Sequence, residues 1–440
     1  LIRTRGAGRY VAEGFYLYFS SSDNTDPNDN GRNYRVSFRK GWGWTLLRLF
    51  GCHRSCWTAA RTGDAAISMR PLSDGDGRQY REAPRRYKTQ LKRALASPRG
   101  GGGMARRVAL VTSHLGAGGA ERQICHVAIL LKQHGWEPAV LTIERPRQGS
   151  DHYLPELTRW GIPIRTAHLA ADAFDWRKFL DLGPLERSLL RGLPEFLRER
   201  VWNLFTHLAA WQPSVVHCFL DRPNVVGSLA GWFAGAGRLV MSFRSVNPTH
   251  FRQQESDTEG LREYYRMLAE SPLVQLSGNS EAGNRDYASW LGVSPGRIAL
   301  VRNILDAERF RPADPDAREA ARARMGIAAG TPVIAGVFRL SHEKGPLRFI
   351  DVVDRVRGRI PGLRVLLAGD GPLAGEVDEA IRVRRLEETV LRVGLREDVA
   401  TIMGASDVVL LTSDYEGTPN VILEAQAMGV PVVASAVGGV

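Results

Sequence analysis

The feature that most constrains the fold is a repeated alternation of short β-rich runs with helical stretches. Apolar runs at 108–112 and 139–143 flank a stretch at 120–134 with helical periodicity. Strands that alternate with helices of this length are typical of parallel α/β sheets. The alternation resumes further along, and it predicts three more strands at 214–219, 238–243 and 273–277. These segments predict an N-terminal α/β domain over residues 104–308.

A second series follows a polar connector at 309–330 that contains two prolines. It predicts strands at 333–337, 363–368, 390–393, 407–412 and 430–435, with helices that begin near Pro346, Leu373, Glu397 and Pro419. Residues 331–440 therefore form a second α/β domain. Two parallel units joined by one connector predict two facing, doubly wound, Rossmann-like domains. Ligands bind such sheets beyond the carboxyl ends of the strands, here in the cleft between the domains.

The basic charge of the chain belongs to its first segment. The net charge is +12, and residues 1–103 hold 19 Lys and Arg against 8 Asp and Glu, so the remainder is nearly neutral. A body of balanced charge argues against a protein that binds nucleic acid by general electrostatics. We predict that the body begins at Met104 and that residues 1–103 are a fused or read-through segment. A basic arm that binds acidic lipid is the alternative.

The apolar runs and cysteines predict a cytoplasmic protein. No apolar run approaches eighteen residues, no signal peptide opens the chain, and four cysteines cannot make a disulfide scaffold. A helical stretch at 172–211 is interpreted as core, and the alternative is an amphipathic surface that meets a lipid-linked acceptor at the inner face of the membrane. Cys52 and Cys56 flank His53 without a second ligand pair, so no metal site is predicted.

The strongest chemical signal is the segment T-S-D-Y-E-G-T-P-N-V-I-L-E-A-Q-A-M-G. Thr418 is predicted to cap a helix whose first residue is Pro419, which leaves free amides for a phosphate. Gly417 would allow the phosphate to approach closely. Glu424 follows about 7.5 Å along the helix axis, where a ribose would lie, and Glu416 would face the group beyond the phosphates. One nucleotide sugar spans these positions.

Two basic residues follow the first strand of the same domain, in V-F-R-L-S-H-E-K-G. A negatively charged leaving group needs positive charge at the carboxyl ends of the strands. Arg339 and Lys344 are predicted to supply that charge. Lys344 is the only lysine after Lys178 in a chain with six lysines.

Together these motifs resemble those of family-4 retaining glycosyltransferases, which have the GT-B fold. E-G-T-P-N-V-I-L-E-A looks like their Glu-x7-Glu motif, and R-L-S-H-E-K-G resembles their diphosphate-binding segment. G-A-G-G-A-E-R at 116–122 is similar to their N-terminal glycine loop, and A-G-D-G-P at 368–372 and N-S-E-A at 279–282 also fit. The resemblance covers about residues 105–440. This type of N-terminal domain resembles enzymes that build bacterial capsule, exopolysaccharide or lipopolysaccharide.

The resemblance implies a role for each matching residue. Glu424 would hold the ribose hydroxyls and Glu416 the donor sugar, while Arg339 and Lys344 would stabilise the departing diphosphate. The other implied donor-binding positions are the amides near Gly417 and Thr418, Gly369 and Gly371 beside the base, and Gly118 and Gly119 over the sugar phosphate. The resemblance further implies transfer with retained configuration, through front-face departure of the nucleoside diphosphate, without a metal or other cofactor.

The sequence departs from the family pattern in three places. Where the family often has H-x-H, this chain has His217, then Cys, then Phe219. His217 is therefore the catalytic candidate there, with Asp221 and Arg222 as alternatives. The usual P-N-G reads R-N-I at 302–304, which alters a hinge-side turn. The family pattern continues beyond the final G-G-V, so the donor domain is expected to be truncated.

The sequence thus predicts a hexosyltransferase that moves sugar from a UDP- or GDP-sugar to a glycan or lipid-linked acceptor. An epimerase or hydrolase with the same cleft would instead need no acceptor. A degenerate nucleotide-sugar binder would give no turnover, and Phe219 favours that alternative. A nicotinamide-dependent dehydrogenase is disfavoured because Glu121 stands where the dinucleotide fingerprint needs its third glycine. No nucleic-acid partner is predicted.

Overall fold

The computed structural model describes residues 91–95, 106–145, 149, 151–167, 182–251 and 255–440, together with five short strands nearer the N-terminus. These strands are β1 (Tyr10–Glu13) and β2 (Tyr16–Phe19), which pair with each other, and β3 (Arg35–Ser37), β4 (Trp57–Ala60) and β5 (Ala66–Met69), which form a second antiparallel sheet. The cysteine pair around His53 and residues 172–181 of the predicted helical stretch lie outside the described residues.

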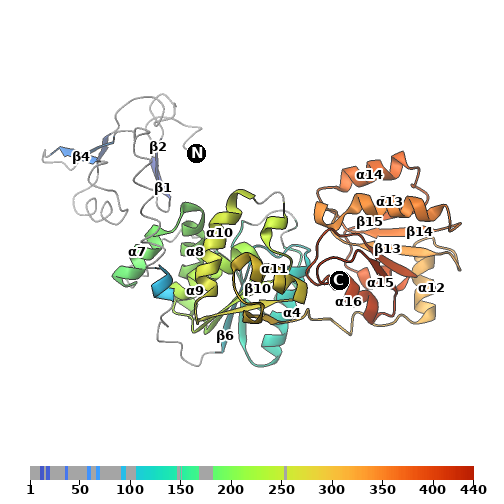
Figure 1. The fold of residues 1–440 in the computed structure, drawn as a ribbon, viewed down its shortest axis with the longest axis horizontal. Helices are drawn as coiled ribbons and strands as arrows, with labels where there is room; N and C mark the ends of the chain where they lie inside the picture. Colours follow the sequence, from blue (N-terminus) through green and yellow to red (C-terminus); the bar gives the residue numbers. More distant parts are fainter. Residues whose placement is uncertain are drawn as a thin grey trace.

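The main body consists of two α/β domains that lie side by side, green and yellow against orange and red in Figure 1. The N-terminal sheet has seven parallel strands in the order β12-β11-β10-β9-β6-β7-β8. Its strands are β6 (Arg107–Thr112), β7 (Glu137–Thr142), β8 (Ile164–Thr166), β9 (Val215–Phe219), β10 (Arg238–Phe243), β11 (Val274–Gly278) and β12 (Ile298–Leu300). The five predicted strands are confirmed. The short edge strands β8 and β12 were missed because three residues show no alternation.

Helices cover this sheet: α4 (Gly119–Gln133), α5 (Leu154–Arg159), α7 (Pro184–Gly192), α8 (Glu195–Trp211), α9 (Asp221–Phe233), α10 (Glu255–Ala269) and α11 (Glu281–Leu291). The buried side chains of α8 include Leu197, Leu204 and Leu208, which join the main apolar cluster of the domain. The apolar residues of α8 are therefore core, as the sequence favoured.

A short helical segment that precedes Met104 also contributes to this core. Leu91 and Leu95 are fully buried in the main apolar cluster. The Ser271 hydroxyl donates a hydrogen bond of 2.6 Å to the Leu95 carbonyl. A chain begun at Met104 would lose these contacts, so experiments on this protein require the full chain.

The C-terminal domain has five parallel strands in the order β15-β14-β13-β16-β17. They are β13 (Val333–Val337), β14 (Arg364–Ala368), β15 (Val390–Gly394), β16 (Val408–Leu411) and β17 (Val432–Ala434), with α13 (Pro346–Arg357), α14 (Ala374–Val383), α15 (Val399–Gly404) and α16 (Asn420–Ala427) between them. Every predicted strand of this domain is confirmed to within two residues at each end.

One helix of the C-terminal half was not expected from the sequence. It is α12 (Pro315–Arg324), which lies within the predicted connector. Its N-cap is Asp314, whose side chain accepts a hydrogen bond of 2.8 Å from the Asp316 amide. Its exposed face is polar, and Ala321 packs in the C-terminal core. The polar composition concealed the helix because most of its surface faces water.

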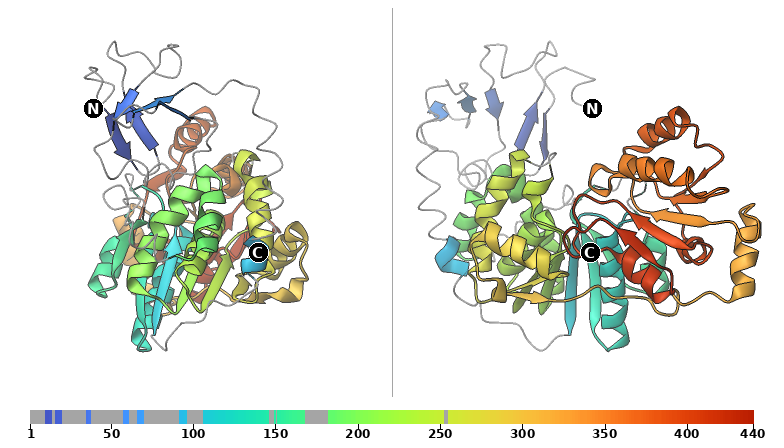
Figure 2. Two further views of the ribbon diagram at one scale, coloured as in Figure 1. Left: turned by 90° about the vertical axis from the view of Figure 1, so that its left-hand side faces the viewer. Right: turned by 45° about the vertical axis from the view of Figure 1, so that its right-hand side comes forward.

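Both sheets are doubly wound, and their chain order reverses between β6 and β9 in one domain and between β13 and β16 in the other. Ligands bind at such reversal points. Two views show α4, in teal, beside α16, in red, where the domains meet (Figures 1 and 2). Within the described part of the chain no helix is both long and apolar enough to cross a bilayer, and contact with a membrane surface stays a prediction.

Candidate active site

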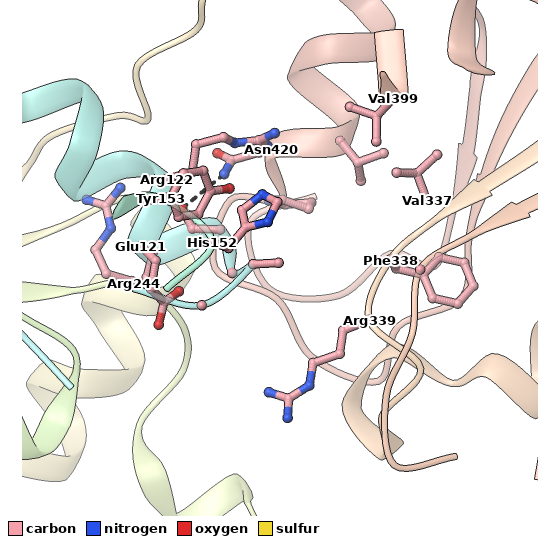
Figure 3. A pocket seen from close by; sticks show the side chains of 18 of the residues that line it. Glu121, Arg122, His152, Tyr153, Arg244, Val337, Phe338, Arg339, Val399 and Asn420 are labelled. Carbon is pink, nitrogen blue, oxygen red and sulfur yellow. Dashed lines mark hydrogen bonds between the residues drawn. The ribbon is translucent and has the colours of Figure 1, made fainter. Parts of the chain in front are cut away.

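A cavity of about 1350 Å³ lies between the two domains. Its walls are the loops that follow β6, β13 and β14 and the residues around the start of α16 (Figure 3). These loops leave the carboxyl ends of parallel strands, where the sequence predicted the binding cleft. Nine of the predicted site residues line the cavity: Gly118, Gly119, Arg339, Lys344, Gly369, Gly371, Glu416, Thr418 and Glu424. His217 and Gly417 are not among the lining residues.

Glu416 is held on two sides at the edge of the cavity. Its carboxylate is buried and accepts hydrogen bonds of 2.6 Å from the Lys344 ammonium and 2.6 Å from the Ser413 hydroxyl. A buried carboxylate with a cationic partner and a hydroxyl donor is fixed in position. Glu416 therefore presents a fixed negative charge to whatever occupies the cleft.

The local backbone explains why Lys344 reaches Glu416. The turn η6 (His342–Lys344) is bonded to the end of β16: the Asp414 amide donates to the Glu343 carbonyl at 2.9 Å, and the Thr412 hydroxyl donates to the Gly345 carbonyl at 3.0 Å. Gly345 has a φ of +59°, and a Cβ there would lie 2.4 Å from the Thr412 carbonyl oxygen. The glycine after Lys344 is thus required for the close approach of the two loops.

Arg339 follows β13 and extends into the cavity (Figure 3). Its side chain is exposed, and it has neither a hydrogen bond nor an ion pair with any described residue. The charge of Lys344 is balanced by Glu416, whereas the charge of Arg339 is not balanced by any described residue. One full positive charge therefore remains at the carboxyl ends of the strands. That charge suits an anionic group such as a diphosphate.

Glu424 lies one turn into α16 and is buried. Arg122, from α4 of the facing domain, donates a hydrogen bond to its carboxylate and forms an ion pair with it. Burial raises the pKa of the Glu424 carboxyl, and the nearby Arg122 and Arg309 oppose that shift. The predicted ribose-binding carboxylate is therefore already paired across the domain boundary.

The start of α16 differs from the prediction. The helix begins at Asn420 with Pro419 as its N-cap, and no side chain caps it. Thr418 was expected to be the cap, but its hydroxyl donates to the Asn279 carbonyl at 2.7 Å in the other domain. At Gly417 a Cβ would lie 2.6 Å from the Arg244 carbonyl oxygen. Gly417 and Thr418 thus allow close contact between the domains, and these contacts explain both residues without a phosphate.

Gly118 lies beneath the side chain of Glu121. It is the N-cap of α4, and Glu121, three residues later, folds back over it. A Cβ at Gly118 would lie 2.0 Å from a Glu121 carboxylate oxygen. Burial raises the pKa of the Glu121 carboxyl, although His114 opposes the shift. The Gly118 amide donates to the Gly116 carbonyl at 2.7 Å, so Glu121 does not form a capping box with it.

Gly369 and Gly371 follow β14 and pack against the backbone of the loop after β13. Gly369 has a φ of +134°, and a Cβ there would lie 1.9 Å from the Phe338 carbonyl oxygen. At Gly371 a Cβ would lie 2.5 Å from the Leu340 carbonyl oxygen. The two glycines therefore fix the loop from which Arg339 extends.

Gly369→Ala is expected to lower the free energy of unfolding by about 2–3 kcal/mol, because alanine must adopt a glycine-only conformation against fixed backbone. Urea denaturation followed by circular dichroism would measure the loss. Gly375→Ala is the control: Gly375 lies in α14 with no atom within 4 Å of its Cβ position. There we expect no loss, or a gain of up to about 1 kcal/mol. Equal effects at both positions would contradict the steric explanation.

His217 does not line the cavity. Its Nε2 lies 2.7 Å from the Ser242 hydroxyl, and its ring packs 4.5 Å from that of Phe219. Burial and then the charge of Arg244 lower the pKa of His217 to about 3, so the imidazole is neutral at physiological pH. Arg244 lies over the Phe219 ring at 5.5 Å and itself lines the cavity. At the strand end where the sequence placed His217, the residue that faces the cleft is therefore Arg244.

A polar network that joins the domains was missed. The Asn303 amide donates to the Thr418 carbonyl at 2.8 Å and to the Asn420 side chain at 2.6 Å, and its oxygen accepts from Arg244 at 2.6 Å. Arg244 could have been identified from its position after a predicted strand. It is the first residue after the strand at 238–243, just as Arg339 is the second residue after the strand at 333–337. The partners of Asn303 lie far apart in the sequence, so nothing local indicates the network.

The two domains and their cleft define the class of protein, the GT-B fold. The similar solved structures include Anabaena Alr3699/HepE in complex with UDP-glucose, which is 22% identical, with a TM-score of 0.59 over 76% of this chain and 81% of that chain. WaaG, a glycosyltransferase involved in lipopolysaccharide biosynthesis, has a TM-score of 0.55 at 17% identity over 76% of this chain and 82% of that chain. At these identities the likeness establishes the fold, and the predicted GT-B architecture is confirmed.

Residues 329–440 match the family described as glycosyl transferases group 1. The Vi polysaccharide biosynthesis protein VipC/TviE of Salmonella typhi is 30% identical over 349 residues, which are 76% of this chain and 60% of that protein. The putative glycosyltransferase EpsF of Bacillus subtilis is 37% identical over 223 residues, 50% of this chain and 57% of that protein. The chain thus spans about three fifths of the length of these relatives. The predicted resemblance to GT-B glycosyltransferases of polysaccharide biosynthesis is confirmed.

Proposed function

We propose that this chain is a retaining hexosyltransferase that uses a UDP- or GDP-sugar and extends a glycan or lipid-linked acceptor of a cell-surface polysaccharide. One observation supports this most: the buried Glu416, fixed by Lys344, shares a single cavity with Glu424 and with the unpaired Arg339. This arrangement offers a carboxylate for a sugar, a carboxylate for a ribose and a cation for the phosphates between them.

In this proposal the donor lies along the start of α16. Two ribose hydroxyls donate hydrogen bonds to Glu424, and Glu416 accepts from the hydroxyls of the donor sugar. Arg339 and Lys344 neutralise the charge that develops on the departing diphosphate. The positive charge that a metal ion would otherwise supply comes from these two side chains, so we propose that no metal is required.

The transfer is a substitution at the anomeric carbon. The acceptor hydroxyl oxygen forms a bond to the anomeric carbon while the bond between that carbon and the phosphate oxygen breaks. The diphosphate leaves with the bonding electron pair and takes up the proton of the acceptor hydroxyl. Attack from the face that the diphosphate leaves retains the configuration. In the positions proposed here, Glu416 stabilises the positive charge that develops on the sugar during this step.

The relatives support the proposed substrates. HepE was crystallised with UDP-glucose, and VipC/TviE is named for polysaccharide biosynthesis. Both features agree with a nucleotide-sugar donor and a glycan acceptor for this chain.

Calorimetric titration of the full chain with UDP and GDP tests the donor site. We expect one of the two nucleotides to bind, and Glu424→Gln to weaken its binding more than about tenfold. Two hydrogen bonds to a carboxylate contribute about 1.5–3 kcal/mol each, which exceeds the effect of releasing Arg122. Glu376→Gln, on the exposed face of α14, is the matched control and should leave the affinity unchanged. Equal affinities for the wild type and Glu424→Gln would contradict the assignment.

The products of the reaction distinguish sugar transfer from hydrolysis, epimerisation and binding without turnover. With the nucleotide sugar that binds and a lipid extract as acceptor, we expect labelled sugar in the lipid fraction, with nucleoside diphosphate released in equal amount. Free or epimerised sugar at the same rate without acceptor would indicate a hydrolase or epimerase. Tight binding without any turnover would indicate a degenerate binder.

A further inference from the structure

The side chain of Arg122 fills the position at which the donor ribose is proposed to bind. Arg122 is the fourth residue of α4, and its guanidinium donates to the carboxylate of Glu424. The two side chains are 16% and 6% exposed, so water hardly reaches the pair. Figure 3 shows Arg122 beside Asn420 at the start of α16. A ligand that bonds to Glu424 must first replace this guanidinium.

The pair exists because Glu424 would otherwise be a lone buried charge. Among the described residues, Arg122 is the only one that bonds to the Glu424 side chain. Arg309 is also close enough to stabilise the charged form, but its guanidinium donates to the Glu397 carbonyl and lies 5.4 Å from the Phe310 ring. An unpaired buried carboxylate costs several kcal/mol. The free protein therefore favours Arg122 on Glu424.

The backbone beneath Arg122 is fixed independently of that pair. The next residue, Gln123, exchanges two hydrogen bonds with Ile304, donating at 2.8 Å and accepting at 2.7 Å. Asn420 donates to the Gly119 carbonyl at 3.2 Å. Gln123 also donates to the Asn420 side chain at 3.3 Å. The two bonds with Asn420 hold the starts of α4 and α16 together. The guanidinium can thus leave Glu424 by side-chain rotation, without the domains separating.

We propose that Arg122 is a specificity-determining residue that competes with the donor ribose for Glu424, so that only a ligand offering two hydroxyl donors in its place gains access. This inference rests on the proposed function, in which Glu424 binds the ribose. The binding free energy of any nucleoside then includes the loss of the Arg122–Glu424 pair. Removing Arg122 eliminates that cost and leaves a buried carboxylate that lacks a partner until a ribose arrives.

Titration of the full chain with uridine and guanosine, which have a ribose and no phosphates, isolates this competition. We expect Arg122→Gln to bind one nucleoside about tenfold more tightly than the wild type. Arg309→Gln is the matched control, because it removes a charge near Glu424 without removing the direct partner; we expect a change below about threefold there. Unchanged or weaker nucleoside binding by Arg122→Gln would overturn the proposal.

A double-mutant cycle shows whether the effect of Arg122→Gln on nucleoside affinity depends on Glu424. In Glu424→Gln the pair is already broken, so adding Arg122→Gln should change nucleoside affinity by less than about twofold. Tighter binding from Arg122→Gln in that background too would overturn the competition. If Glu424→Gln binds UDP and GDP as the wild type does, the donor assignment itself fails. If no variant binds a nucleoside or a nucleotide, both proposals are wrong, whereas binding by Arg122→Gln alone supports the competition.

Discussion

Glu416→Gln is expected to lower the rate of sugar transfer by on the order of 10²–10³-fold, the loss typical of removing one electrostatic contact to a transition state. In the proposed site Glu416 stabilises the positive charge that develops on the donor sugar. Glutamine keeps the size of the side chain and its hydrogen bond from Ser413, but not the negative charge. Release of nucleoside diphosphate from the nucleotide sugar, in the presence of acceptor, would measure the rate.

The same variant should bind the nucleotide almost as well as the wild type, because Glu416 faces the group beyond the phosphates. A large fall in turnover with little change in affinity is the pattern of an interaction made in the transition state. Glu343→Gln is the matched control, since Glu343 also lines the cavity but accepts a hydrogen bond of 2.5 Å from Ser341 in its own turn. A similar fall in turnover for Glu343→Gln would show that any lost charge in this cavity is harmful.

The sequence was most informative where one local pattern determines the structure. The strand at 333–337 is a continuous apolar run and the strand at 238–243 is apolar except for Arg238 and Ser242, as expected for strands that are buried on both faces of a parallel sheet. Their predicted bounds are those of β10 and β13. Arg339 lies two residues after β13 and Glu416 five residues after β16, so the parallel order of the strands places both at the cavity edge of the sheet.

The sequence was least informative where two distant segments meet. His217 has the expected strand, but Arg244 from the next strand covers that strand end. Thr418 resembles a helix cap by its position, yet the other domain offers its hydroxyl a carbonyl acceptor at Asn279. Arg122 ends the motif at 116–122, and the sequence predicts no role for it, since its partner Glu424 lies 302 residues away. Contacts of this kind depend on how the domains face each other, which no periodicity encodes.

Arg339 and Lys344 were predicted as equivalent cations, and their surroundings show that they are not. Lys344 neutralises a buried carboxylate, whereas Arg339 has no partner among the described residues. The two charges are proposed to act together on the diphosphate, but only one of them also stabilises the folded protein. Matched glutamine variants at the two positions can therefore separate a loss of activity from a loss of stability.

For Arg339→Gln we expect turnover to fall by on the order of 10²-fold and the affinity for the nucleoside diphosphate by about tenfold. The thermal midpoint should not change, because no contact within the protein is removed. For Lys344→Gln we expect a similar fall in turnover together with a thermal midpoint lower by several degrees, since the buried Glu416 carboxylate then lacks its cationic partner.

Calorimetry with the nucleoside diphosphate and thermal unfolding followed by circular dichroism would measure both variants in parallel. The double variant Lys344→Gln with Glu416→Gln should recover much of the lost thermal stability, because the unpaired charge is gone, but none of the activity. A recovery of that kind would show that Lys344 stabilises the fold through Glu416 alone. A thermal midpoint lowered equally by Arg339→Gln and Lys344→Gln would contradict the different roles that their surroundings indicate.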